Sequence, residues 1–190
     1  MVNTDDEINF NPNPTLPEMK WAVKGNVPDI LNIQNSHGLL PNYNEEAIEY
    51  AIHKMVTRIA VVGNNVHGVW IGGLESHGSG IEYRLAEMYV AQPALGTGVT
   101  RLMLNDVMQA AEAANIEVRR LAAVKNEKDF AQVREVTLRV PEYLCRPDFP
   151  ESCIGWLQHV GFVATGVVDR DFYFHEGKPY DGYMFSMRLP

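Results

Sequence analysis

This sequence is short of cysteine, and it has neither a long apolar run nor a cluster of basic residues. Its two cysteines, Cys145 and Cys153, are too few for a disulfide framework, and their spacing matches no zinc motif. We therefore expect two reduced thiols, no catalytic thiol and no metal site. No apolar stretch is long enough to cross a bilayer, and the opening residues MVNTDDEINF lack the regions of a signal peptide. These absences predict a cytoplasmic protein without a membrane anchor.

The charge balance is acidic. The chain has 16 Lys and Arg against 24 Asp and Glu, a formal net charge of -8. Binding along a nucleic-acid backbone needs clustered positive charge, so we expect no nucleic-acid partner. Net acidity attracts small cations, but it equally serves solubility, and the sequence leaves both interpretations open.

The length suits one domain with a tail. Residues 1–17 are polar and aperiodic, which predicts a flexible N-terminal tail before a single domain over 18–190. Apolar periodicity predicts the order β-α-α-β-β-β-α-β-α-β-β. The expected helices cover about residues 28–34, 45–55, 99–114 and 152–160, and the expected strands about 21–23, 59–62, 66–74, 81–90, 117–124, 163–175 and 183–189. Asn44 is the expected N-cap of the second helix, and Gly161 is the expected C′ residue of the last one. Residues 125–150 are unassigned, although Phe130, Val133, Thr137 and Val140 have the spacing of a helical face.

The strand expected over 81–90 changes phase. Ile81, Tyr83 and Leu85 are apolar at odd positions, whereas Met88 and Val90 are apolar at even positions. Because side chains alternate with a period of two, one extra residue is needed between the two halves. The pattern therefore predicts a β-bulge.

A glycine-rich loop, residues 92–100 (QPALGTGVT), joins this strand to a strong helix. Glycines let backbone N–H groups approach an anion, and the helix N-terminus adds a positive dipole. Taken alone, the loop suits a dinucleotide site or a tight turn equally well. It is not a Walker A loop, because GxxxxGK[ST] is absent, and it does not open a βαβ unit as a Rossmann loop does.

Four motifs in order resemble the GNAT superfamily of acyl-CoA-dependent N-acyltransferases, and together they span about residues 19–190. The first is Val90 and Pro93 followed by Gly96-x-Gly98, and the second is Leu121-x-x-Val124-x-Asn126, which resembles the next strand. The third is Gly161-Phe162 at the end of the last helix, and the fourth is Met187-Arg188-Leu189. The resemblance implies an α/β (α+β) fold with a mixed, mostly antiparallel central sheet. In that sheet the fourth and fifth strands are splayed and helices flank both faces.

The resemblance also implies acetyl-CoA as the acyl donor. It assigns the backbone of Met88, Tyr89 and Val90 to the acyl-pantetheine arm, and Asn126 to the arm or its amide. It assigns the diphosphate to the loop amides of Leu95, Gly96, Thr97, Gly98, Val99 and Thr100. Arg101 would add a cation there, or is an ordinary surface residue. Leu95 and Thr100 depart from the family pattern, but the backbone donors survive both changes.

The implied reaction is direct attack of a primary amine, on a small molecule or a peptide, on the acetyl thioester. Glu82 and Glu87 are the base candidates, and either one could instead face solvent. Leu157 stands where the family often has an acidic tyrosine. Tyr143, inside an expected insert at about 127–150, is a substitute candidate or a packing residue.

Acids and aromatics in the final hairpin suit a cationic amine, and an exposed hairpin edge would allow a homodimer. Two other functions stay open at this point. One is a GNAT-fold CoA-binding or regulatory module without turnover, and the other is a nucleotide binder that is not an acyltransferase.

Overall fold

The computed structural model describes residues 16–37, 44–77, 80–125, 132–145, 153–175 and 178–189. Within these ranges seven strands form one sheet in the order β1-β2-β3-β4-β5-β7-β6. Neighbouring strands are antiparallel except for the parallel pair β4 and β5. The strands are β1 (Glu18–Trp21), β2 (Val56–Val62), β3 (Asn65–His77), β4 (Gly80–Val90), β5 (Val133–Pro141), β6 (Val163–His175) and β7 (Lys178–Arg188).

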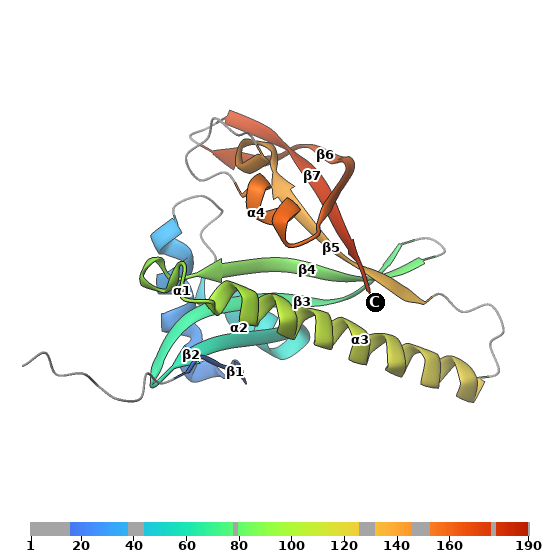
Figure 1. The fold of residues 1–190 in the computed structure, drawn as a ribbon, viewed down its shortest axis with the longest axis horizontal. Helices are drawn as coiled ribbons and strands as arrows, with labels where there is room; N and C mark the ends of the chain where they lie inside the picture. Colours follow the sequence, from blue (N-terminus) through green and yellow to red (C-terminus); the bar gives the residue numbers. More distant parts are fainter. Residues whose placement is uncertain are drawn as a thin grey trace, which may run out of the picture.

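Helices cover both faces of the sheet. The elements are α1 (Val27–His37), α2 (Glu45–Lys54), α3 (Val99–Lys125), α4 (Ile154–His159) and the 3-10 turns η1 (Lys24–Asn26), η2 (Gln92–Ala94) and η3 (Glu142–Cys145). One face carries α3 and α4, and the other carries α1 and α2 (Figure 1). The predicted element order is confirmed.

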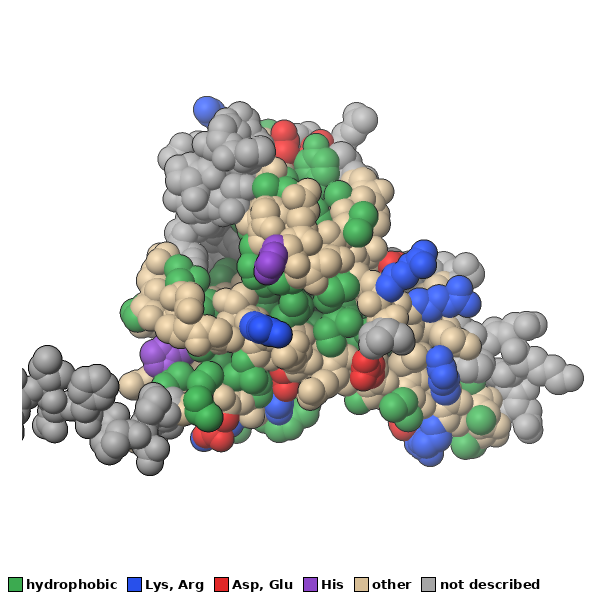
Figure 2. Space-filling view, viewed as in Figure 1, with side chains coloured by type: hydrophobic (Ala, Val, Ile, Leu, Met, Phe, Trp, Pro, Cys, Tyr) green, Lys and Arg blue, Asp and Glu red, His purple; other side chains and the backbone are tan. Residues whose placement is uncertain are grey.

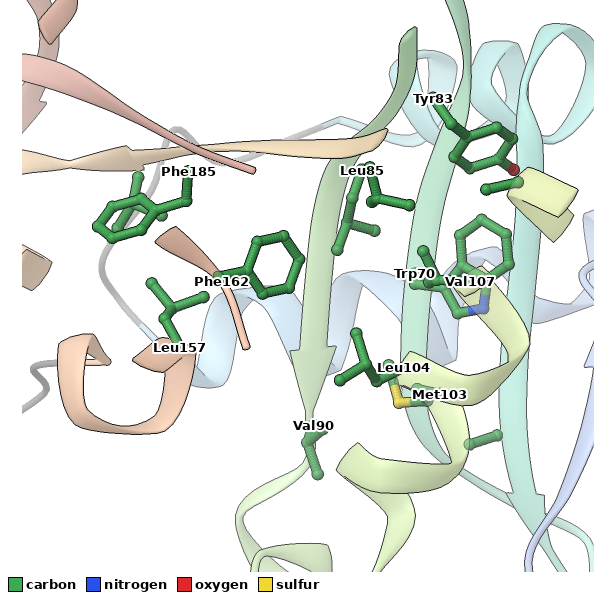
Figure 3. Close-up of a cluster of buried hydrophobic side chains, with 14 of the residues drawn as sticks. Trp70, Tyr83, Leu85, Val90, Met103, Leu104, Val107, Leu157, Phe162 and Phe185 are labelled. Carbon is green, nitrogen blue, oxygen red and sulfur yellow. The ribbon is translucent and has the colours of Figure 1, made fainter. Parts of the chain in front are cut away.

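Each face has its own buried cluster. The α3-side cluster contains Trp70, Tyr83 and Met103, and Figure 3 shows how it continues through Phe162 to Phe185. The α1-side cluster contains residues of α1 and α2 packed on β2, β3 and β4: Ile30, Ile33, Ile48, Val69, Ile71 and Tyr89. A strand of this sheet therefore buries alternate side chains in different cores, so the phase of β4 decides which residues face which helices.

Helix ends follow the sequence signals. The Asn44 side chain accepts a hydrogen bond from the Ala47 N–H at 2.9 Å, which confirms the predicted N-cap of α2. At the end of α4, the Gly161 N–H donates to Gln158 O and the Phe162 N–H donates to Leu157 O, with Gly161 at φ 99. This is a Schellman ending, and it confirms the predicted C′ glycine.

The strand expected over 117–124 is wrong, because α3 continues through it to Lys125. The apolar spacing seen as far as Ala114 carries on at Val118, which packs against the α3-side cluster, and at Ala122, which is buried. Arg120 also pairs with Glu117 one turn earlier, at 2.7 Å. Such spacing and such i,i+3 pairs stabilise helices, whereas the β-branched residues in the segment are too few to specify a strand.

The fifth strand instead lies at Val133–Pro141, within the range that was unassigned and expected as an insert. The helical face proposed for Val133, Thr137 and Val140 is therefore wrong. Val136 and Thr137 are both buried, because β5 is covered on both faces and paired with β4 and β7. A strand buried on both faces loses the alternation that identifies strands in a sequence.

Some expectations fall on other parts of the chain. Asn126, Phe130 and residues 1–15 of the expected tail lie outside the described residues. No helix in the described part of the chain combines the length and apolarity needed to cross a membrane.

Candidate functional site

The site begins with the predicted irregularity in β4. Ile71 pairs with Glu87 while the next residue of β3, Gly72, pairs with Leu85, so Ala86 is the extra residue of a bulge. Leu85 before the bulge and Val90 after it both join the α3-side cluster. The phase change read from the sequence is therefore confirmed, and it turns Glu87 towards the α1 side.

The bulge also marks where β4 and β5 part. Their parallel pairing runs from Ile81 with Val133 to Leu85 with Leu138 and ends there. Both strands continue, β4 to Val90 and β5 to Pro141, and they diverge as they do so (Figure 1). Hydrophobic side chains gather between α3 and α4 on the face shown in Figure 2. The splayed fourth and fifth strands that were expected are present.

The glycine-rich loop follows directly from the end of β4. Within it, the Leu95 N–H donates to Gln92 O at 3.2 Å and the Thr97 N–H donates to Ala94 O at 3.3 Å. Two of the six predicted diphosphate donors are therefore already bonded in this structure. Among the described residues, no acceptor takes the amides of the other four, which are Gly96, Gly98, Val99 and Thr100.

The two loop glycines have backbone conformations that other residues rarely adopt. Gly96 has φ 77 and Gly98 has φ 89. A Cβ built on either glycine meets no heavy atom within 4 Å, so the space in front of the loop is open. Successive backbone amides in a glycine-rich turn of this kind can bind an anion.

The N-terminus of α3 adds a positive partial charge next to the loop. Its first turn contains no acidic residue, so the helix dipole is not offset there. Arg101 lies in the same turn, is exposed, and makes no ion pair with any described residue. The loop, the helix end and this guanidinium together favour a negatively charged ligand group.

A buried acid holds α3 against the sheet two turns further on. Asp106 accepts hydrogen bonds from Arg58 Nε at 3.0 Å, Arg58 Nη2 at 2.9 Å and Trp70 Nε1 at 2.9 Å. The side chains of Arg58 and Asp106 are only 18% and 15% exposed. Because Arg58 is on β2 and Trp70 is on β3, this acid sets the position of α3 and of the amides at its start. Sequence reasoning missed Asp106, although an acid between Met103 and Val107 on an apolar helix face was a usable signal.

The two base candidates lie in different surroundings. Glu82 lies opposite Glu75 of β3 in the strand register, in the part of β4 that is still paired with β5. Glu87 follows the bulge, beside the point where the strands part, and its Oε2 accepts a hydrogen bond from Gln34 Nε2 at 3.0 Å. Sequence reasoning missed Gln34, which ends the short apolar helix pattern of residues 28–34. The Tyr143 backbone is in η3, and its side chain is outside the described part.

Nearby side chains supply little reactive chemistry. Leu157 is fully buried in the α3-side cluster and carries no proton to donate. Burial raises the pKa of Cys153 to about 11. Burial, with smaller contributions from the neighbouring Cys153 and Glu142, raises the pKa of Cys145 to about 12. Both thiols therefore stay protonated near neutral pH, which suits structural rather than nucleophilic cysteines.

Cavities in the described part include the following two. The larger, about 740 Å³, is bordered by Trp21, Leu74 and Ala110 and touches neither the loop nor Glu87. The smaller, about 260 Å³, lies between α1 and the turn η2, where Asp29 and Gln92 line it. Geometry at the bulge and the loop, rather than cavity size, therefore marks the candidate site.

No family model and no curated protein sequence matches the chain. Solved structures match it in fold. Naa20 from Chaetomium thermophilum, solved with a bisubstrate analogue, is 18% identical with a TM-score of 0.67, covering 90% of this chain and 86% of that one. The ribosomal-protein-S18-alanine N-acetyltransferase from Escherichia coli is 11% identical with a TM-score of 0.64, covering 92% and 94%. YncA from Salmonella typhimurium, solved with its cofactor acetyl-CoA, is 13% identical with a TM-score of 0.62, covering 92% and 94%.

These likenesses confirm the fold class. The chain has the fold of the GNAT N-acetyltransferases, with a mostly antiparallel sheet, a parallel β4–β5 pair that splays, and helices on both faces.

Proposed function

We propose that this protein is an acetyl-CoA-dependent N-acetyltransferase. The observation that carries the proposal is the bulge at Ala86, where pairing with β5 ends and a loop follows in which four amides bond no described acceptor. The shared fold adds support, since one neighbour was solved with acetyl-CoA and another with a bisubstrate analogue.

The chain's groups fit this donor. The amides of Gly96, Gly98, Val99 and Thr100 have no acceptor among the described residues and suit a diphosphate, and Arg101 supplies a nearby cation. The amides of Leu95 and Thr97 shape the loop and would join the diphosphate site only by exchanging their present bonds. The acyl-pantetheine arm is assigned to the backbone of Met88, Tyr89 and Val90, which lie beyond the pairing with β5. The resemblance assigns Asn126 to the same arm as the end of a strand over 117–124, and α3 occupies that segment instead.

Bound acetyl-CoA supplies an acetyl thioester, whose carbonyl carbon is attacked by a neutral amine with release of the thiol. The protein's task is to deliver that amine without its extra proton, and Glu87 is the base we assign to it. Glu87 stands beside the opening, whereas Glu82 lies where the two strands are still joined. Backbone N–H groups at the start of α3 hold acetyl-CoA in place, whereas Glu87 removes the proton, so different segments bind the cofactor and activate the amine.

For the acceptor we propose a primary amine of a small molecule or a peptide. The formal net charge of -8 favours a cationic molecule. We also propose that the enzyme works in the cytoplasm. The described sheet ends in β6, so its edge is available for the homodimer expected from the sequence, and sedimentation velocity would test that assembly.

Turnover and binding separate the candidate functions. Melting temperatures with acetyl-CoA, CoA and a nicotinamide dinucleotide report binding, and thiol release across an amine panel, with product mass, reports transfer. We expect stabilisation by acetyl-CoA, thiol release with at least one primary amine, and a product heavier by one acetyl group. Glu87→Gln should keep the stabilisation and lose most of the turnover.

A CoA-binding module without turnover is the second candidate, because the buried Leu157 cannot donate a proton from the position where the family often has a tyrosine. Stabilisation by acetyl-CoA with no thiol release on any amine would establish it instead. Stabilisation by the dinucleotide alone would overturn both candidates.

A further inference from the structure

Gln34 is an unusual residue for its place in α1. The helix packs Ile30 and Ile33 into the α1-side cluster, and Gln34, one turn after Ile30, is only 8% exposed. Its Nε2 donates to Glu87 Oε2 on β4, 53 positions away in sequence, at 3.0 Å. An ionised carboxylate can only accept hydrogen bonds, so the amide must turn its NH2 group towards Glu87.

That orientation leaves the other end of the amide without a partner. Gln34 Oε1 is buried, and among the described residues no donor reaches it. A buried acceptor without a donor destabilises a fold, and a leucine or methionine would complete the apolar face of α1 at this position. Nothing within α1 offsets the free-energy cost of burying Gln34 Oε1 without a donor. The interaction that Gln34 does make is its hydrogen bond to Glu87.

We infer that Gln34 is a positioning residue, which holds the Glu87 carboxylate ionised and correctly oriented beside the opening between β4 and β5. This inference rests on the proposed function, in which Glu87 is the base. In the proton transfer, an N–H bond of the acceptor's ammonium group breaks and an O–H bond forms on Glu87, leaving the amine neutral. Only an ionised Glu87 can accept that proton, and a donor from α1 favours that form.

Other charged groups share this face and act on Glu87 as well. Because Tyr83 and Leu85 face α3, Glu82 and Arg84 face the α1 side, as Tyr89 does beyond the bulge. Other ionisable side chains on the elements packed here include Glu75 on β3 opposite Glu82, Arg139 on β5, the exposed Asp29 on α1, and His67 on β3, which borders the smaller cavity together with Asp29. Arg84 already bonds Glu75 at 2.6 and 2.8 Å. Changing Gln34 alters none of these charges, so a shift in Glu87 titration reports the amide itself.

The test measures Glu87 directly, by carbon-13 NMR titration of the glutamate carboxyl groups, with Glu87 assigned from its absence in Glu87→Gln. In Gln34→Leu we expect the Glu87 titration midpoint to rise by about one pH unit, the size of a lost hydrogen bond to a charged group. The acid limb of the kcat/KM profile should rise by the same amount, with acetyl-CoA affinity unchanged. Gln34→Met is a second variant, and circular dichroism should show both folded.

Two comparisons exclude a merely structural effect. Thr57→Val removes another buried and unpartnered polar atom, Thr57 Oγ1 on β2, and should move neither the titration nor the pH profile. In a Glu87→Gln background, Gln34→Leu should cause no further loss of turnover, because its effect passes through Glu87.

An unchanged Glu87 midpoint in folded Gln34→Leu and Gln34→Met overturns the inference. The proposed function fails separately: if no amine is acetylated by the unaltered protein, yet the midpoint moves, Gln34 holds Glu87 but the reaction is not acetyl transfer.

Discussion

Replacing Gly98 by alanine tests the proposed diphosphate site in the glycine-rich loop. Gly98 has φ 89, and an added Cβ meets no atom within 4 Å, so the free protein bears a backbone cost but no clash. That backbone cost is about 1 kcal/mol, as for other residues forced into left-handed conformations. The methyl group would stand in the open space from which the anion approaches.

The effect on affinity is larger than the effect on stability. Moving the diphosphate away from the loop weakens one or two hydrogen bonds to a charged group, each contributing about 1.5–3 kcal/mol. We therefore expect isothermal titration calorimetry to show acetyl-CoA binding weakened by about 10- to 100-fold in Gly98→Ala.

Gly63→Ala is the matched control. Gly63 has φ 62, follows β2 in a turn, and also has nothing within 4 Å of its added Cβ. Both variants should lower the melting temperature by about 2–4 °C, because the backbone cost is the same. Only the loop variant should lose affinity. If Gly98→Ala binds acetyl-CoA as tightly as Gly63→Ala does, the loop amides do not hold the diphosphate and the site assignment is refuted.

Three further predictions concern the elements that support the site. Asp106→Asn leaves the Arg58 charge, which is 18% exposed, without its ion-pair partner, so urea unfolding should show a loss of about 3 kcal/mol, and a loss below about 1 kcal/mol would contradict that role. Burial raises the Cys153 pKa in the folded state from the ordinary 9.0 to about 11, so between pH 9 and 11 the unfolded thiol ionises first and stability should fall, by about 3 kcal/mol at most. Cys153→Ala should flatten that decline, and an unchanged slope would show that other groups cause it. Deleting Ala86 removes the bulge but leaves Glu87 and Val90 on their present faces, because Leu85 and Glu87 would then pair regularly with Gly72 and Ile71, so circular dichroism should show a folded chain. Acetyl-CoA affinity should fall because the irregularity at which β4 parts from β5 is gone, whereas Ala86→Gly should fold and bind acetyl-CoA, and an unchanged affinity in the deletion would contradict this role of the bulge.

The sequence predicts the features that are local. The bulge in β4, the N-cap at Asn44 and the glycine ending of α4 each arise from residues within one or two turns of each other, and all three are present. The loop was also located correctly, because glycines before an amphipathic helix are a local signal. Which of its amides are free depends on turns at Gln92 and Ala94 that the motif does not specify.

The features that were missed depend on distant partners. β5 is buried on both faces and paired on both edges, so its pattern lacked alternation and resembled a helical face. Asp106 meets Arg58 across 48 positions, and Gln34 meets Glu87 across 53. A single sequence shows that such residues are polar within apolar patterns, but it does not show which partner each one meets.

The bulge also bears on which of the two glutamates is the better base candidate, because simple side-chain alternation would place them on the wrong faces of the sheet. Glu82 and Glu87 are five positions apart, so in a regular strand they would face opposite sides of the sheet. The extra residue Ala86 puts both on the α1 side, and facing direction therefore cannot distinguish them. What distinguishes them is the end of pairing at Leu85: Glu82 stands where β5 still closes the strand edge, and Glu87 stands two residues beyond it. The bulge absorbs Ala86 without moving Glu87 to the α3-side core, and the end of pairing with β5 leaves Glu87 next to the opening, where the proposed base would meet an incoming amine.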